Sequence, residues 1–161
     1  MNAWNLAQIN VGRLRAPIDD PMIADFASSL DRINALADGA PGFVWRLVGA
    51  GGDATDIQPS ADDPNLIVNM SLWRDLDALA AFVYRSDHRS VMRRRAEWFE
   101  KMDVYMALWW TPAGHTPSVE EGLAALERLE RLGPTPAAFT FRAPYPAPDG
   151  RPAAPVLDVC A

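Results

Sequence analysis

Several kinds of residue are scarce in this sequence, and each scarcity excludes a class of site. The 161-residue chain has a single cysteine, Cys160, so neither an internal disulfide nor a cysteine-based metal cluster can form. Its only histidines, His88 and His115, have no cysteines near them and are not spaced as a zinc signature requires. We therefore expect no metal site.

Long apolar runs and an excess of basic residues are also missing. No uninterrupted apolar stretch approaches the roughly 18 residues that a membrane span needs, and no basic segment followed by an apolar one marks the N-terminus. The chain has 15 Lys and Arg against 21 Asp and Glu, a formal net charge of −6. Phosphate binding needs a broad cationic surface. We expect a cytoplasmic protein that binds neither membranes nor nucleic acid.

What the sequence does contain is the composition of an ordinary globule, with 49% hydrophobic and 22% charged residues. A chain of this length buries roughly two thirds of its extended surface, which is enough for one real core. We expect a single domain over residues 1–142. Residues 143–161 contain five prolines and are expected to form an irregular tail.

The hydrophobic periodicity predicts an α+β fold. Alternating segments predict strands over residues 3–11, 42–48, 65–73 and 104–110. Capping residues and apolar stripes predict helices over residues 21–37, 76–83 and 88–102. The resulting order, β-α-β-β-α-β, is that of ferredoxin-like folds. A capping box at Ser118 and Glu121 predicts an extra C-terminal helix ending at Gly133, followed by a short extended piece around Phe139.

The predicted third strand has two different faces. Its apolar row is Leu66, Val68, Met70 and Leu72, and its mixed row is Ile67, Asn69, Ser71 and Trp73. The apolar row is typical of a sheet face against packed helices. The mixed row is too apolar for open water and too polar for a dry core, so it favours a ligand cavity. Tyr105 and Trp109 make one face of the fourth strand similarly aromatic.

Cations gather on the stretch from Leu79 to Trp110, which holds six of the fifteen basic residues and His88. Consecutive helical residues point about 100° apart, so Arg93, Arg94 and Arg95 cannot all face inward. Arg95 shares a stripe with His88, and it is the expected buried arginine. His88 itself has two interpretations: a structural residue at a helix N-terminus, or a general base facing a ligand.

Three segments resemble the conserved blocks of the family known as domain of unknown function 3291. They are FVYRSDHRSVMRRRAEWFEKM, MALWWTPAGHTPSVEEGLAALERL and LGPTPAAFTFR. The resemblance implies a dimeric α+β barrel, in which two ferredoxin-like subunits join their sheets and each holds a pocket. That superfamily includes antibiotic-biosynthesis monooxygenases, haem-using enzymes, polyketide cyclases and stress proteins, so the fold leaves the chemistry open.

A finer similarity concerns the cofactor-free monooxygenases of that superfamily that oxidise polyketide anthrones. Asn69, Trp73 and Arg93 can be aligned with the asparagine, tryptophan and arginine that surround the substrate there. A tyrosine of that pattern is replaced by Leu79, so Tyr84 or Tyr105 would have to substitute for it. An Asn-x-x-x-Trp pair alone is a weak signal.

The resemblance favours a homodimeric enzyme that oxidises an aromatic or polyketide-like small molecule without a cofactor. His88 is the predicted base, and Arg93 or Arg95 is predicted to stabilise the substrate anion. The predicted substrate-binding residues are Asn69, Trp73, Tyr84, Tyr105 and Trp109. Trp109 has a second interpretation, as a core or dimer-interface residue. Alternative functions are a polyketide cyclase, a haem-binding protein, and a non-catalytic ligand-binding or stress protein.

Overall fold

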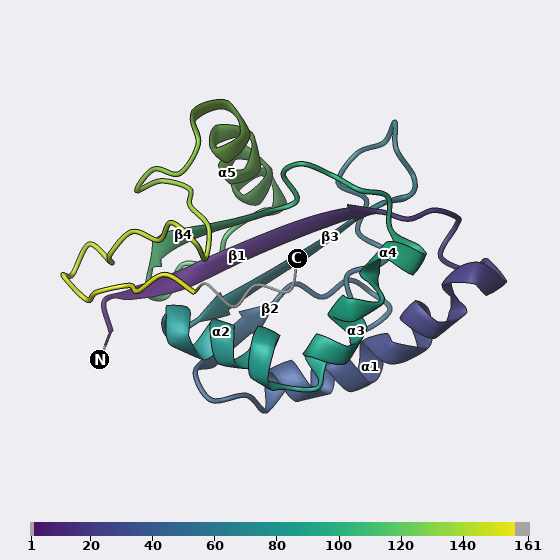
Figure 1. Ribbon diagram of the computed structural model, residues 1–161, viewed down its shortest axis with the longest axis horizontal. Coiled ribbons are helices and arrows are strands. Elements are labelled where there is room, and N and C mark those ends of the chain that lie inside the picture. Colours follow the sequence, from purple (N-terminus) through teal and green to yellow (C-terminus); the bar gives the residue numbers. More distant parts are fainter. Residues whose placement is uncertain (1, 157–161) are drawn as a thin grey trace.

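A four-stranded antiparallel sheet forms the centre of the protein in the computed structural model, which describes residues 2–156 (Figure 1). The strands are β1 (Trp4–Arg13), β2 (Phe43–Arg46), β3 (Leu66–Trp73) and β4 (Met106–Pro112). Their order in the sheet is β2-β3-β1-β4, with every neighbouring pair antiparallel. This order and the β-α-β-β-α-β sequence of elements confirm the predicted ferredoxin-like α+β fold.

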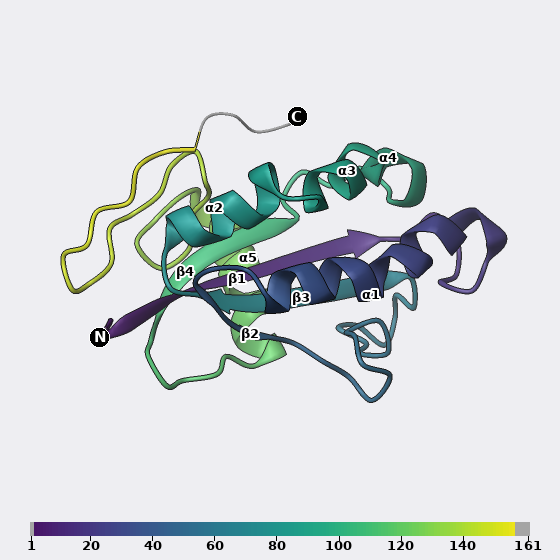
Figure 2. The same cartoon turned by 90° about the horizontal axis from the view of Figure 1, so that it is seen from below.

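The helices lie on both sides of the sheet. One face carries η1 (Pro21–Ile23), α1 (Ala24–Asp38), α2 (Leu76–Arg85), α3 (His88–Arg93) and α4 (Arg95–Trp98) (Figures 1 and 2). The opposite face carries α5 (Val119–Leu132), which begins at the predicted Ser118 cap, where the Ser118 hydroxyl accepts a hydrogen bond from the Glu121 amide. Among residues 2–156, no helix combines the length and apolarity needed to cross a membrane.

The α5 side of the sheet is sealed by apolar packing. The apolar row of β3 is buried there together with Ile9 of β1 and Ala125, Leu126 and Leu129 of α5. Gly122 lets the helix approach closely, because a Cβ at that position would lie 2.6 Å from Ile9 Cδ1. The predicted packing of this row against a helix is therefore confirmed, and a helix of the same chain covers it.

The other side of the sheet is only partly sealed. At one end Leu6, Trp73 and Leu108 pack with α2 in a second apolar cluster. At the other end Phe99 and Trp98 pack with Phe26 of α1 in a third cluster. Between these two clusters the sheet presents polar side chains, which is where the cavity described below lies.

The helical segment predicted over residues 88–102 is shorter than expected. It is interrupted at Arg94 and ends at Trp98, because Phe99 adopts an extended backbone. Phe99 forms a β-bridge with Leu14, and the Glu100 amide donates to the Arg13 carbonyl at 2.8 Å. Backbone pairing with the chain after β1 thus overrides the helical pattern, a tertiary effect that local periodicity does not contain.

The fourth strand begins later than predicted, and this separates two residues that were expected on one face. Tyr105 precedes β4 and its ring lies 4.6 Å from the Arg95 guanidinium, on the side of α1 to α4. Trp109 lies within β4 and packs in the α5-side cluster. The prediction that Tyr105 and Trp109 share a face is therefore wrong.

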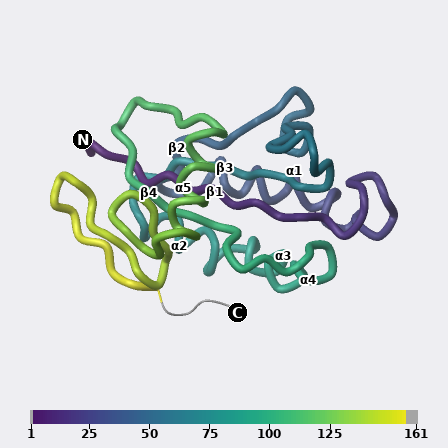
Figure 3. The backbone as a smooth tube through the Cα atoms, turned by 90° about the horizontal axis from the view of Figure 1, so that it is seen from above, coloured from purple at the N-terminus to yellow at the C-terminus, as the bar shows by residue number. Residues whose placement is uncertain are grey.

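The described part of the proline-rich tail is irregular but firmly attached beside β4 and the start of β1 (Figure 3). The indole of Trp110 donates to the Tyr145 carbonyl at 2.9 Å, and Arg151 donates to the Trp4 carbonyl at 2.6 Å. The expected extended piece forms a single β-bridge between Phe139 and Leu108. Cys160 lies outside the described residues.

Gly12 offers a test of the packing between β1 and the residues after α4. A Cβ at Gly12 would lie 2.5 Å from Phe99 Cδ1, so the Phe99 ring would have to move. We expect Gly12→Ala to lower the free energy of unfolding by about 1–3 kcal/mol, the usual cost of overpacking. Urea denaturation measures this, with Gly51→Ala as the control because nothing lies within 4 Å of a Cβ there. Equal stabilities of the two variants would contradict this packing.

Candidate functional site

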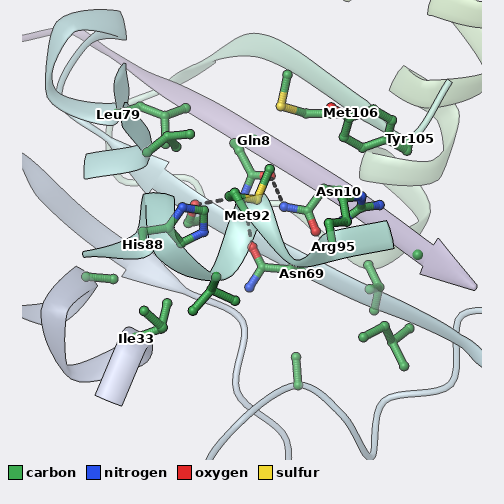
Figure 4. A pocket seen from close by; sticks show the side chains of 18 of the residues that line it. Gln8, Asn10, Ile33, Asn69, Leu79, His88, Met92, Arg95, Tyr105 and Met106 are labelled. Atoms are coloured by element: carbon green, nitrogen blue, oxygen red, sulfur yellow. Dashed lines mark hydrogen bonds between the residues drawn. The ribbon is translucent and has the colours of Figure 1, made fainter. Parts of the chain in front are cut away.

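A cavity of about 690 Å³ lies between the sheet and helices α1 to α4. Volumes between roughly 300 and 1,000 Å³ are typical of small-molecule sites. Its walls are mainly apolar, and Figure 4 shows His88, Met92 and Arg95 around a group of polar side chains that project from the sheet. These sheet residues are Gln8 and Asn10 of β1 and Asn69 and Ser71 of β3.

Strand register brings the four polar side chains together. Gln8 is paired with Ser71, and Asn10 with Asn69, so all four project from the same face. Gln8 Nε2 donates to Asn69 Oδ1 at 2.9 Å and to Ser71 Oγ at 3.0 Å. Asn10 Nδ2 donates to Gln8 Oε1 at 3.1 Å. The hydrogen bonds satisfy polar groups that would otherwise be costly to bury, and they hold the cavity floor in one arrangement.

Trp73 closes one end of this floor. Its indole Nε1 donates to Ser71 Oγ at 2.8 Å, and its ring stacks on Phe82 with centroids 5.2 Å apart. Only 1% of the residue is exposed. The ring therefore bounds the cavity as part of the core, with its one polar group already engaged.

Arg95 brings a positive charge to the other end of the floor. Its guanidinium lies between two aromatic rings, 4.7 Å from the Phe99 centroid and 4.6 Å from that of Tyr105. It donates to the Val11 carbonyl at 3.3 Å, and within residues 2–156 it forms no ion pair with a carboxylate. Burial lowers the pKa of Arg95, but an arginine remains protonated at neutral pH. Among the described residues, the cavity thus contains a cation that is not paired with a carboxylate, although Asp53 and Asp103 also belong to the cavity lining.

His88 is placed in the cavity by the break between α2 and α3. Ser86 ends α2, its hydroxyl donating back to the Phe82 carbonyl while accepting from the His88 amide at 3.2 Å. The His88 ring packs on Phe82 with centroids 4.9 Å apart, and its Nδ1 atom is buried without a hydrogen-bond partner. Burial lowers the pKa of His88, and the Val83 carbonyl opposes only part of this effect. A neutral imidazole, able to accept a proton, is therefore favoured.

Two exposed ion pairs join α1 to α3 and α4 beside the cavity. Arg32 pairs with Asp87, and Arg94 pairs with Asp25 at 2.8 Å. Asp87 is thus an ion-pair partner, and its side chain makes no capping hydrogen bond to α3. Because the pairs are solvent-exposed, they orient the helices more than they stabilise them.

The structure brings together most of the residues predicted for the site. Six of the eight line the cavity: Asn69, Trp73, Tyr84, His88, Arg95 and Tyr105. Arg93 is exposed at the end of α3 and outside the lining, and Trp109 packs under α5 on the other side of the sheet. Neither position fits contact with a ligand in this cavity. Arg93 is misplaced by the alignment because Arg95, two residues later, lies on the inward stripe.

Gln8 and Asn10 are site residues that the sequence analysis missed. The signal was present, since two amides in succession on one face of a central strand are unusual in a dry core. His115 lies elsewhere and contacts the Glu121 carboxylate at 2.9 Å near the start of α5. Among residues 2–156, no group of three or more His, Cys, Asp or Glu side chains is arranged to hold a metal ion.

Chemically, the cavity combines a cation, amide hydrogen-bond donors and a neutral base within apolar walls. The Asn69 amide nitrogen makes no bond to the other floor residues, so it remains available to a ligand. Water exclusion strengthens the attraction between Arg95 and an anion. Such a site is suited to a planar apolar molecule that carries, or acquires, negative charge on oxygen.

The buried His88 predicts a specific pH dependence of stability. Its folded pKa lies below the ordinary 6.5, so on acidification the unfolded chain takes up the proton first. This contribution to stability is fully present above pH 6.5 and is lost as the pH falls toward the lowered folded value. We expect wild type to lose more stability than His88→Gln between roughly pH 7.5 and 5, measured by urea denaturation at each pH. Parallel losses in the two proteins would contradict a buried, neutral His88.

Comparisons with known proteins place the chain in a family. Structures with similar folds include SnoaB, a cofactor-independent oxygenase from Streptomyces nogalater, at 18% identity and a TM-score of 0.46, covering 70% of this chain and 95% of that one. Rv0793 from Mycobacterium tuberculosis has 16% identity and a TM-score of 0.47, covering 71% and 99%. Among curated proteins none matches. The model for the domain of unknown function DUF3291 matches residues 5–154, and the chain therefore belongs to this family.

Proposed function

We propose that this protein is a small-molecule enzyme of the cofactor-independent monooxygenase type, which oxidises an aromatic or polyketide-like substrate in the cavity. The observation that carries the proposal is the Arg95 cation, which makes no ion pair within residues 2–156 and lies between the Phe99 and Tyr105 rings in a mainly apolar cavity. Burying a charge without a counterion costs stability, and a bound anion would recover that cost. Flat apolar walls suit an aromatic ring system.

In the proposed reaction His88 accepts a proton from an acidic C–H or O–H group of the substrate. The resulting anion is stabilised by Arg95 and by the Asn69 amide. The anion transfers one electron to molecular oxygen, and the substrate radical and superoxide then combine to form a C–O bond. The peroxide takes the proton back from His88 and loses water, which leaves a carbonyl. A CH₂ group and O₂ thus yield C=O and H₂O, with no external reductant.

Substrate positioning is proposed for Asn69, Tyr84 and Tyr105, which line the cavity. Trp73 would contribute a wall, because its indole N–H is already bonded to Ser71. Arg93 and Trp109 are left out of the proposed mechanism, since they lie outside the lining. The proposal includes no cofactor.

A cyclase remains the second candidate, because the same base and cation would also promote an intramolecular aldol reaction. Its distinguishing property is that turnover consumes no oxygen. Haem binding is tested separately, by adding haem and recording whether a Soret shift appears that depends on His88.

We also propose that the protein forms a homodimer. The sheet face opposite the cavity is buried under α5 of the same chain. Two chains would therefore meet at another surface, and size-exclusion chromatography with light scattering measures whether they do.

Oxygen uptake with candidate polyketide anthrones or naphthols tests the oxidation. We expect wild type to consume one O₂ per product, and His88→Ala and Asn69→Ala to lower kcat/KM by about 10²-fold or more, as losses of a base or an oxyanion donor do. Arg93→Ala is the matched control, since it removes an arginine of the same helical region that lies outside the cavity.

Full activity of His88→Ala would remove His88 from the mechanism, and turnover without oxygen uptake would favour the cyclase. Arg93→Ala as damaging as His88→Ala would contradict the assignment of the reaction to this cavity. Circular dichroism confirms that each variant is folded.

A further inference from the structure

We infer that Gln8 is a positioning residue that fixes Asn69 as a hydrogen-bond donor to the ligand, and that the site therefore selects an acceptor, above all an anionic oxygen, at Asn69. The inference deepens the proposed function and rests on it in taking the cavity as the substrate site. It concerns binding selectivity, which can be measured without turnover.

Gln8 is fully occupied by its neighbours. Only 5% of the residue is exposed, and it lies in the central strand β1. Both hydrogens of its amide are used, one on Asn69 Oδ1 and one on Ser71 Oγ, and its Oε1 accepts from Asn10. No N–H group of Gln8 is left for a ligand, so any effect of Gln8 on the binding of an anionic oxygen must pass through the side chains that it orients.

The direction of this hydrogen-bond chain follows from groups that can only donate. Arg95 donates to the carbonyl of Val11, the residue next to Asn10, and the side chains of Asn10 and Arg95 both line the cavity (Figure 4). A cation there favours the carbonyl end of the Asn10 amide, which turns its Nδ2 toward Gln8. Gln8 must then accept with Oε1 and donate with Nε2.

The opposite orientation of the hydrogen-bond chain is disfavoured by the contact between Gln8 and Asn10. If Gln8 were flipped, its nitrogen would face Asn10, and Asn10 would have to direct its own NH₂ group toward the side of Arg95. Two sets of donors would then face each other in a poorly solvated site. Ser71 does not oppose the observed direction, because it can accept from both Trp73 Nε1 and Gln8 Nε2.

The consequence appears at Asn69. Because Asn69 Oδ1 is occupied by Gln8, the end of the amide left for the cavity is the NH₂ group (Figure 4). Asn69 and Arg95 then both present donors, so a carboxylate, phenolate or enolate oxygen finds complementary partners. A ligand with an N–H at the same place does not.

A matched pair of probes tests this selectivity: 2-naphthoate and 2-naphthamide, which share a ring system and differ in a carboxylate or a carboxamide. We expect wild type to prefer naphthoate and Gln8→Met to lose about 10- to 100-fold of naphthoate affinity, the cost of a misoriented hydrogen bond to a charged group. Asn69→Ala should lose a similar factor, and Gln8→Met/Asn69→Ala no more than Asn69→Ala alone. The control is Thr111→Val, a buried polar residue of β4 outside the cavity, which should bind as wild type does.

Three results would each overturn the inference. In the first, the losses of naphthoate affinity in Gln8→Met and Asn69→Ala multiply in the double variant. In the others, Gln8→Met keeps the wild-type preference for naphthoate, or wild type shows no preference. Oxygen uptake plays no part in these measurements. A positive selectivity result with no turnover would therefore reject the proposed oxidation and keep the role of Gln8.

A second readout uses wild type alone and does not depend on how the variants fold. Side-chain amide exchange by NMR should show the Gln8 NH₂ protons protected and the Asn69 NH₂ protons exchanging fast, then becoming protected when 2-naphthoate is added. Protected Asn69 protons in the free protein, or Asn69 protons indifferent to naphthoate, would overturn the inference.

Discussion

The polar floor formed by Gln8, Asn10, Asn69 and Ser71 is the constraint on which the rest of this structure depends. Polar groups in the middle of a sheet cannot be covered by apolar helix side chains without losing their hydrogen bonds. Here the four side chains form hydrogen bonds with one another, and the cavity separates them from the helices on that side of the sheet. On the opposite face Val68, Met70 and Leu72 of β3 form an apolar row, and α5 packs against that face closely enough to require Gly122. One sheet therefore supports a sealed core and an open site.

The charge in the cavity stands apart from the electrostatics of the rest of the chain. The protein has a net charge of −6, and exposed arginines such as Arg94 pair with nearby carboxylates, which raises the pKa of Arg94. Arg95, the next residue, has aromatic rings as neighbours, and burial lowers its pKa. The interruption of the helix at Arg94 helps to separate the two environments. Among the described residues Arg95 forms no ion pair, so its guanidinium can pair with an anion that enters the cavity.

Much of the fold was predictable because it depends on periodicity and capping. The two faces of β3 and the Ser118 cap appear as expected, and the helical segment predicted from residue 21 begins there as a short 3₁₀ turn. The errors arise where long-range contacts determine the backbone conformation or the side-chain direction. Phe99 leaves the helix to pair with Leu14, and the Tyr105 ring turns toward Arg95. For the site, the predicted stripe places both His88 and Arg95 in the cavity lining, whereas Arg93 lies outside it. Gln8 and Asn10 can be recognised as site residues only from the strand register, which pairs them with Ser71 and Asn69.

In the proposed function, Arg95 makes this cavity a site for an anionic aromatic molecule. Calorimetric titration of 2-naphthoate into wild type and Arg95→Met measures the contribution of Arg95 to binding. We expect one molecule bound per chain, and an affinity at least about tenfold lower in the variant, because a charge-assisted hydrogen bond is lost. The variant should remain folded, since methionine fills similar space between Phe99 and Tyr105 and removes an unpaired buried charge. Undiminished binding by a folded Arg95→Met protein would contradict the account.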